Sequence, residues 1–213
     1  MSAMSRSRPA IDVSQHLIDP GRLSESEATI DWASLFGNSN PVELEIGSGK
    51  GLFLINAGRS RPDVNFLGIE LARKYAIFAA GRLSRAELKN AKVWCGDGRL
   101  VIERLVPAQS LAGVHVYFPD PWWKTRHKKR RVFTAELVRE IERTLIPGGQ
   151  LSVASDVAEY FGVIRGLIAA SGRFREQELP ARTEPEHPLD YLTHFERKYR
   201  LEGRPIYQAR YTL

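Results

Sequence analysis

The run Val42-Glu43-Leu44-Glu45-Ile46-Gly47-Ser48-Gly49-Lys50-Gly51 joins an apolar strand pattern to a turn that contains three glycines. Glycine adopts positive φ angles at little cost and lets the backbone approach a ligand closely. A helical pattern follows directly, so the run predicts a strand, a tight turn and a helix. A strand–turn–helix unit of this kind is the building block of a mainly parallel α/β sheet.

The same alternation continues along the chain and predicts a mainly parallel central sheet with helices on both faces. Strands are expected at Val42–Ile46, Asn65–Glu70, Ala91–Cys95, Val114–Phe118 and Gln150–Ser155. Helices are expected at about Gly51–Arg59, Ala72–Leu88, Arg99–Leu105, Thr134–Ile146 and Val157–Ser171. The partly alternating tail Pro205–Leu213 is expected to return to the sheet.

Length and composition set the outer limits of the prediction. The 213 residues suffice for one full hydrophobic core. We expect residues 1–35, which are polar and weakly periodic, to form an N-terminal arm, and residues 36–213 to form one domain. The net charge of +6 favours acidic partners. The single cysteine, the lack of an apolar signal core and the lack of a membrane-length apolar run predict a cytoplasmic protein with no membrane partner.

Acidic residues follow the first three predicted strands. Glu45 precedes the glycine turn, Glu70 ends the second strand, and Asp97 follows the third. Carboxylates at these positions accept hydrogen bonds from ribose hydroxyls and from an adenine amino group. The spacing Gly-x-Gly-x-Gly departs from the dinucleotide pattern Gly-x-Gly-x-x-Gly, so S-adenosylmethionine, which carries an ammonium and a sulfonium, fits better than NAD. The alternative is that each carboxylate only caps the following helix.

The fourth strand leads into Phe118-Pro119-Asp120-Pro121-Trp122-Trp123-Lys124-Thr125-Arg126-His127-Lys128-Lys129-Arg130-Arg131. Ligands of open α/β sheets bind beyond the carboxyl ends of the strands, so Asp120 is the expected catalytic carboxylate. A basic run beside it indicates a polyanionic substrate, with phosphate contacts expected from Arg126, His127, Lys128, Lys129, Arg130 and Arg131. A solvated charged loop is the alternative. One tryptophan is expected to stack on a base or to pack under the loop.

The ordered motifs EIGSGKG, GIE, GDG and PDPWWKTRHKKRR resemble those of class I S-adenosylmethionine-dependent methyltransferases, which have a Rossmann-like fold. Within that superfamily, the chain is similar to the bacterial tRNA (guanine(46)-N(7))-methyltransferases. The resemblance implies that the methyl donor is bound by Glu45, Gly47, Gly49, Glu70, Asp97 and Asp120. It also implies that tRNA is bound by Lys124, Asp156 and the segment Thr193, His194, Phe195 and Glu196.

Two positions depart from the pattern of this family. Ser155 stands where a threonine is usual, which keeps the hydroxyl, and His194 replaces a lysine, which removes a fixed charge. His115, inside a strand pattern, is expected to be a core histidine, and no metal-ligand spacing is present. The sequence leaves the oligomeric state open between monomer and homodimer.

The expected reaction needs no strong general base, because guanine N7 carries an exposed lone pair and no proton has to leave. Asp120 and Asp156 are expected to accept hydrogen bonds from the N1–H and amino groups of guanine. Three other readings stay open: an amino-group methyltransferase acting on adenine or cytosine, a non-catalytic RNA-binding module with a degenerate pocket, and an NAD oxidoreductase.

Overall fold

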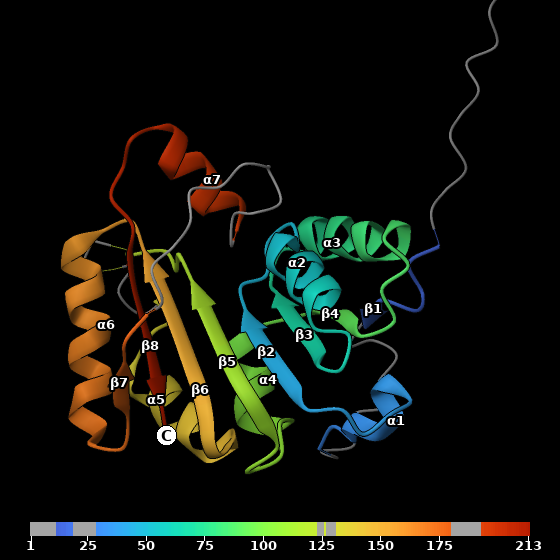
Figure 1. Cartoon of the computed structure of the whole chain (residues 1–213), viewed down its shortest axis with the longest axis horizontal. Helices are drawn as coiled ribbons and strands as arrows, with labels where there is room; N and C mark the ends of the chain where they lie inside the picture. Colours follow the sequence, from blue (N-terminus) through green and yellow to red (C-terminus); the bar gives the residue numbers. More distant parts are fainter. Residues whose placement is uncertain (1–11, 19–28, 123–125, 127–130, 180–192) are drawn as a thin grey trace, which may run out of the picture.

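The computed structural model describes residues 12–18, 29–122, 126, 131–179 and 193–213. One sheet of eight strands runs through the molecule (Figure 1). The strands are β1 (Leu17–Ile18), β2 (Val42–Ile46), β3 (Asn65–Glu70), β4 (Ala91–Cys95), β5 (Leu111–Tyr117), β6 (Leu145–Ser155), β7 (Arg175–Gln177) and β8 (Tyr207–Thr212). The helices are α1 (Trp32–Phe36), α2 (Leu52–Ser60), α3 (Arg73–Arg85), α4 (Gly98–Arg104), α5 (Ala135–Thr144), α6 (Ala158–Ser171) and α7 (His194–Leu201).

The strand order β1-β4-β3-β2-β5-β6-β8-β7 reverses direction between β2 and β5. From β2 the chain builds outward through β3 and β4, and it then crosses back to place β5 on the other side of β2. Among the described strands, β8 runs antiparallel to both β6 and β7, and the other neighbouring pairs are parallel. A reversal of this kind opens a crevice at the carboxyl ends of the strands, where ligands of such folds bind. The predicted Rossmann-like architecture is confirmed.

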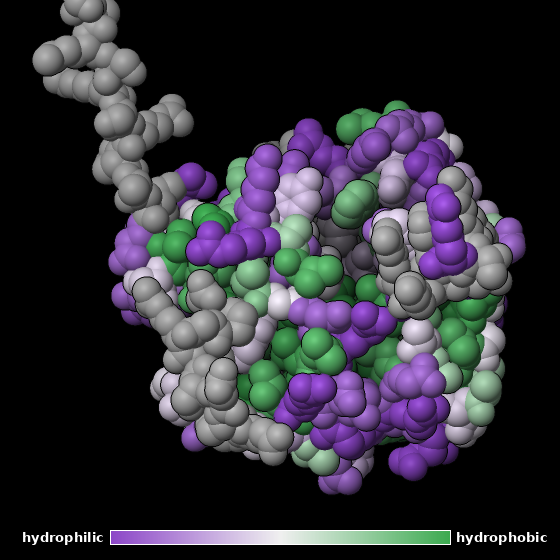
Figure 2. All heavy atoms as spheres, turned by 180° about the vertical axis from the view of Figure 1, so that it is seen from behind, coloured by the Kyte–Doolittle hydropathy of each residue, from purple (hydrophilic) through white to green (hydrophobic). Residues whose placement is uncertain are grey.

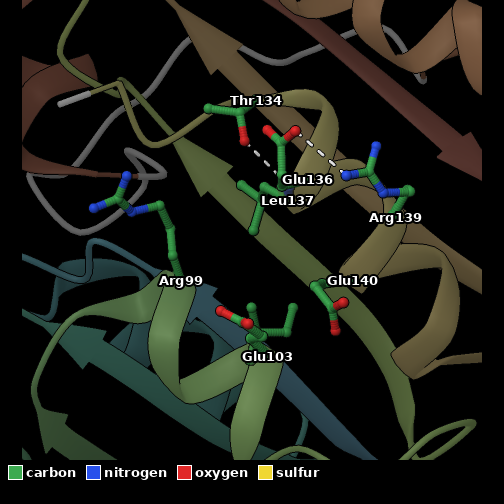
Figure 3. A pocket seen from close by; sticks show the side chains of 8 residues that line it. Arg99, Glu103, Thr134, Glu136, Leu137, Arg139 and Glu140 are labelled. Atoms are coloured by element: carbon green, nitrogen blue, oxygen red, sulfur yellow. Dashed lines mark hydrogen bonds and ion pairs between the residues drawn. The ribbon is translucent and has the colours of Figure 1, made fainter. Parts of the chain in front are cut away.

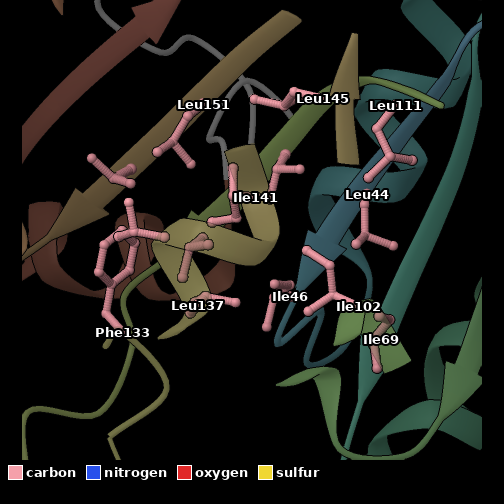
Figure 4. Close-up of a cluster of buried hydrophobic side chains, with 14 of the residues drawn as sticks. Leu44, Ile46, Ile69, Ile102, Leu111, Phe133, Leu137, Ile141, Leu145 and Leu151 are labelled. Atoms are coloured by element: carbon pink, nitrogen blue, oxygen red, sulfur yellow. The ribbon is translucent and has the colours of Figure 1, made fainter. Parts of the chain in front are cut away.

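Helices cover both faces of the sheet. In Figure 1, α2 and α3 lie in front of the sheet, whereas α4 and α5 lie behind it. The larger hydrophobic cluster lies between β2, β3, β5 and β6 and the helices α4 to α6, and Figure 4 shows side chains from both layers pointing toward one another. A smaller cluster lies beneath α2 and α3. Two buried layers on one sheet make the strand ends a rigid base for a site.

Helix α5 illustrates how local sequence sets its bounds. The Thr134 hydroxyl accepts a hydrogen bond from the Leu137 N–H at 3.2 Å and caps the first turn. The helix ends at Thr144, two residues before the predicted end, because Leu145 already pairs with Leu111 in the sheet. Strand β6 therefore begins five residues earlier than predicted and passes an irregularity before regular pairing resumes at Gln150.

Part of the expected N-terminal arm packs on the domain. Strand β1 pairs in parallel with β4, and α1 begins at an Asp31 cap and ends at Gly37, which has a φ of 74°. Trp32 and Phe36 pack against the larger hydrophobic cluster. The sequence pattern missed these elements because two strand residues and a five-residue helix are too short to show a period.

The tail returns to the sheet as predicted, because β8 pairs with β6 from Tyr207 to Thr212. Among the helices of the described ranges, none is long and apolar enough to cross a membrane.

Truncating Leu44 tests the core. Its side chain is fully buried in β2, so Leu44→Ala leaves a cavity and should lower the free energy of unfolding by about 2–5 kcal/mol. The matched control is Leu201→Ala, at a leucine that is 72% exposed, and its cost should stay within about 0.5 kcal/mol. Urea denaturation measures both variants. Equal losses would show that the core does not lie where the structure has it.

Candidate functional site

The glycine turn after β2 leaves its backbone open on one side. Gly47 and Gly49 have φ angles of 83° and 53°, which glycine adopts without strain. A Cβ atom at either position would meet nothing within 4 Å, whereas one at Gly51 would lie 2.9 Å from the Cβ of Ala79. The first two glycines therefore leave room for a ligand, and the third allows α2 and α3 to pack closely.

Glu45 is a buried carboxyl with an unsatisfied oxygen. Its side chain is 2% exposed, and its Oε2 atom has no hydrogen-bond partner. Burial raises the pKa of Glu45 well above its ordinary value, and the nearby charge of Glu70 raises it further. Burying a carboxyl without a partner is costly, so this oxygen is suited to a cationic or N–H-bearing ligand.

Glu70 and Asp97 already bind backbone at the strand ends. The two carboxylate oxygens of Glu70 accept hydrogen bonds from the Gly49 N–H at 2.8 Å and the Ala72 N–H at 2.7 Å. Asp97 caps α4 and forms an ion pair with Arg99 at 3.0 Å. The capping alternative is therefore confirmed for Asp97 but not for Glu70, because α3 begins after Ala72 without a side-chain cap. A carboxylate has about four lone-pair positions, so each can still accept a bond from a ligand.

The loop after β5 holds Asp120 at the strand end. The Phe118 N–H donates to the Ala154 carbonyl of β6 at 2.8 Å, which extends the pairing of the two strands by one residue. Phe118 and Trp122 have φ angles of 52° and 40°, which are strained for residues with side chains. This strained turn, which includes two prolines, leaves the Asp120 carboxylate exposed.

The second predicted carboxylate, Asp156, is paired with a residue just beyond helix α7. Asp156, just after β6, forms an ion pair with Arg204, and the Arg204 guanidinium lies 4.1 Å from the centroid of the Tyr199 ring. Burial raises the pKa of the Tyr199 phenol, and the charges of Asp156 and Asp120 raise it further. Asp120 and Asp156 follow β5 and β6, which are parallel neighbours, so the two predicted site residues lie at the same end of the sheet.

The segment from Thr193 to Glu196 begins α7. The Thr193 hydroxyl accepts from the Glu196 N–H at 3.1 Å, and the 48%-exposed ring of Phe195 has its centroid 6.4 Å from that of Phe118. Glu196 is 1% exposed and pairs with Arg200 at 2.9 Å. Phe195 is thus accessible to a substrate, whereas Glu196 anchors the helix in this structure.

His194 connects α7 to α3. A guanidinium N–H of Arg82 donates to His194 Nε2 at 2.6 Å, and the same Arg82 nitrogen donates to the Lys50 carbonyl at 3.1 Å. Burial lowers the pKa of His194, and the charges of Arg82, Lys50 and Arg197 lower it further. A neutral imidazole accepts from Arg82, which the lysine usual in the resembled family could not do. The substitution therefore creates a link between the two helices.

The basic run lies mostly outside the described residues. This applies to Lys124, His127, Lys128, Lys129, Arg130 and Trp123. Arg126 is exposed, as a phosphate contact requires. Arg131 instead donates to the Pro121 carbonyl at 2.7 Å and lies 5.0 Å from the centroid of the Tyr160 ring, so it holds the loop of Asp120 in place.

A buried polar chain beside the site was missed from the sequence. Arg61 forms a two-pronged ion pair with Glu43 at 2.6 and 2.8 Å, and Glu43 lies 2.8 Å from His115 Nε2. Burial lowers the pKa of His115, so Nε2–H donates to Glu43 and Nδ1 accepts from the Tyr117 hydroxyl at 2.8 Å. His115 is thus a satisfied core histidine, as predicted. The only sign of this polar chain in the sequence was Glu43, an acidic residue two positions before Glu45.

A groove between α4 and α5 is the other candidate (Figure 3). It is lined from both helices by charges of both signs, which partly pair with each other, as Glu136 and Arg139 do at 3.3 Å. The carboxyl ends of the strands are the stronger candidate site, because an unsatisfied carboxyl and an open glycine turn lie together there. Seen from behind, the molecular surface is hollowed toward that end of the sheet (Figure 2).

Comparisons with known proteins show which family the sequence matches. A family model described as a putative methyltransferase matches residues 39–209. A Rhodopirellula baltica protein named tRNA (guanine-N(7)-)-methyltransferase is 43% identical over 216 residues, which cover 99% of this chain and 79% of that protein. A Myxococcus xanthus protein of the same name is 36% identical over 184 residues, which cover 86% of this chain and 89% of that protein.

Solved structures show the same fold. The 16S rRNA methyltransferase KamB superposes with a TM-score of 0.59 at 18% identity, over 86% of this chain and 93% of that chain. The aminoglycoside resistance methyltransferase NpmB1 gives a TM-score of 0.57 at 17% identity, over 83% of this chain and 89% of that chain. At these identities the likeness concerns the fold alone.

The buried Glu45 carboxyl predicts an unusual pH dependence of stability. A folded-state pKa above the ordinary value of 4.5 means that the contribution of Glu45 to stability is complete below about pH 4.5 and is lost as the pH rises through the raised pKa. A glutamine cannot ionise, so Glu45→Gln does not lose stability as the pH rises through that pKa. The melting temperature of the variant, measured relative to that of the wild type, should therefore rise from about pH 5 to pH 8.

Glu43→Gln is the matched control with the opposite sign. Although burial opposes it, the hydrogen bond from His115 and the ion pair with Arg61 lower the pKa of Glu43 to about 2. Its stabilisation is complete above the ordinary value of 4.5 and fades as the pH falls toward 2, so Glu43→Gln should be destabilised most at neutral pH. If the melting temperatures of both variants, relative to the wild type, changed with pH in the same direction, Glu45 and Glu43 would not differ in environment as the structure has them.

Proposed function

Because the chain belongs to the tRNA (guanine-N(7)-)-methyltransferase family, we propose that it transfers a methyl group from S-adenosylmethionine to N7 of guanine 46 in the variable loop of tRNA. The observation that carries the proposal is the meeting of two sets of carboxylates at one end of the sheet. On one side of the topological switch, Glu45 lies near the end of β2, Glu70 ends β3 and Asp97 follows β4. On the other side, Asp120 follows β5 and Asp156 follows β6.

The first set fits the methyl donor. The unsatisfied Oε2 of Glu45 is suited to the ammonium of S-adenosylmethionine, and the open backbone at Gly47 and Gly49 leaves room for the aliphatic chain beside that ammonium. Glu70 and Asp97 can accept hydrogen bonds from hydroxyl and amino groups of the ligand. When bound, S-adenosylmethionine supplies a methyl group activated by a positively charged sulfur. The residues of this set hold a cation and offer no cradle of N–H donors to a pyrophosphate, which favours this cofactor over NAD.

The second set fits guanine. Asp120 and Asp156 can accept hydrogen bonds from N1–H and from the exocyclic amino group, two donors that adenine does not present in that arrangement. These bonds become stronger as positive charge develops on the purine, so they stabilise the transition state more than the ground state. No residue has to remove a proton from N7. The strained turn that fixes Asp120, together with the ion pair of Asp156 and Arg204, supplies the alignment.

The tRNA backbone is the proposed partner of the basic run. Lys124, Arg126 and the cations from Lys128 to Arg130 adjoin Asp120 in sequence, so phosphates around the target nucleotide would lie within their reach. The exposed Phe195 ring provides a face for stacking on the flipped-out base. We place the reaction in the cytoplasm, which a chain with one cysteine fits.

Methyl transfer to an unmodified tRNA transcript tests the proposal. The protein should transfer label from S-adenosylmethionine, and mass spectrometry of the digested RNA should identify 7-methylguanosine. Replacing the guanine at position 46 of the transcript should abolish the product. A methylated adenosine or cytidine would instead establish the amino-group reaction, and tight tRNA binding without any product would support a non-catalytic module.

Asp120→Ala tests the assignment of the catalytic carboxylate. Losing one pre-organised acceptor in the site should lower kcat by about a hundredfold or more, while the melting temperature stays within a few degrees because the carboxylate is exposed. Asp63→Ala removes an exposed carboxylate from a turn before β3 and is the control. Turnover by Asp120→Ala equal to that of Asp63→Ala would contradict the assignment.

A further inference from the structure

The exposed face of α3 combines aromatic and cationic side chains. Tyr75, Phe78, Arg82 and Arg85 are spaced by three or four residues and therefore line one side of the helix. The two rings are 43% and 50% exposed. The Nζ atom of Lys50, from the glycine turn, lies 5.9 Å from the centroid of Tyr75 and 6.0 Å from that of Phe78. We define the α3 face as Lys50, Arg59, Tyr75, Phe78, Arg82 and Arg85.

The positive charges of the α3 face are not balanced by acids. Arg59 lies in the last turn of α2, which packs against α3, and it is exposed. Burial lowers the pKa of Arg82, and the charges of Arg59 and Arg85 lower it further. Within the ranges that the structure describes, none of the four cations forms an ion pair with an acid. Like charges that are held together repel, and a polyanion would relieve that repulsion.

The α3 face adjoins the proposed active site. Arg82 donates to the Lys50 carbonyl at 3.1 Å and to His194 Nε2 at 2.6 Å, so it touches both the glycine turn and the start of α7. In Figure 1, α3 and α7 lie at the end of the molecule where the carboxyl ends of the strands lie. An RNA that presents one nucleotide to Asp120 and Asp156 has to extend beyond them, and this surface is a direct continuation.

We propose that the α3 face binds a part of the tRNA away from the target guanine. The four cations contact backbone phosphates, and the rings of Tyr75 and Phe78 stack on unpaired bases. Cations beside exposed aromatic rings suit single-stranded or looped RNA, because phosphates recur at every nucleotide and every base has a face for stacking. The proposal rests on the proposed function, since it assigns more of the same tRNA to this protein.

Neutralising two cations tests the phosphate contacts. In the double variant Arg59→Gln with Arg85→Gln, both substituted side chains are exposed, and Arg82 keeps its contacts with α7. Fluorescence anisotropy with labelled tRNA at about 50 to 200 mM salt should show an affinity loss of about tenfold at the low-salt end. The magnitude of the slope of log affinity against log salt should fall by about two, one for each lost phosphate contact.

A charge-matched control separates this surface from the total charge of the protein. Arg104→Gln with Arg175→Gln also removes two exposed arginines, from the end of α4 behind the sheet and from the edge strand β7. The control should change the salt slope by less than half of the change that Arg59→Gln with Arg85→Gln causes. Equal effects of the two double variants, or no effect of either, would overturn the proposal.

Phe78→Ala tests the stacking contact. Losing one base–aromatic contact should weaken tRNA binding about fivefold or more without changing the salt slope, and Phe78→Tyr should restore binding. The affinity for S-adenosylmethionine and kcat at saturating tRNA should stay at wild-type values, so that the loss appears in KM for tRNA. Unchanged tRNA affinity in Phe78→Ala would refute the stacking contact. Failure of the wild-type protein itself to methylate tRNA would instead overturn the proposed function.

Discussion

The site depends on one buried carboxyl. Glu45 is the last residue but one of β2, beside the topological switch, and one of its oxygens has no hydrogen-bond partner among the described residues. A fold accepts that cost only where the group acts on something else. The glycine turn that follows leaves the space in front of the carboxyl open, because Gly47 and Gly49 carry no side chains there. Burial disfavours the charge of Glu45, and a cation bound beside the carboxyl would offset that cost.

The site has two electrostatic halves that suit two different ligands. The carboxylates of β2, β3 and the turn after β4 are the proposed partners of a positively charged methyl donor, whereas the cations of the α3 face and of the basic run are the proposed partners of a polyanionic RNA. Helix α7 joins the halves, because His194 contacts Arg82 at one end of the helix and Arg204, just beyond its other end, pairs with Asp156. Separation of this kind lets one surface attract RNA without repelling a cationic cofactor.

Sequence reasoning predicted the elements with clear periodicity and the acids at the strand ends. Five strands of the sheet, the helices that follow them and the returning tail were predicted in the right order, since burial imposes their spacing, although β5 and β6 begin three and five residues earlier than predicted. The pattern could not show that Glu196 is buried, that Arg131 is tied to Pro121, or that Glu43 pairs with Arg61 and His115. Those interactions join distant segments, and no local period records them. The role of His194 also needed the position of Arg82, more than a hundred residues away in the chain.

The most direct test of the central claim is the proton balance of cofactor binding. Calorimetric titration with S-adenosylmethionine at about pH 6.5, where the ammonium of the ligand is intact, should be repeated in buffers of different ionisation enthalpy. Burial raises the pKa of Glu45 in the free protein, and a cation bound beside this carboxyl should lower that pKa, so binding should release protons to the buffer. Glu45→Gln should bind the cofactor more weakly and release none. A buffer-independent enthalpy for the wild type, with equally tight binding by Glu45→Gln, would contradict the account.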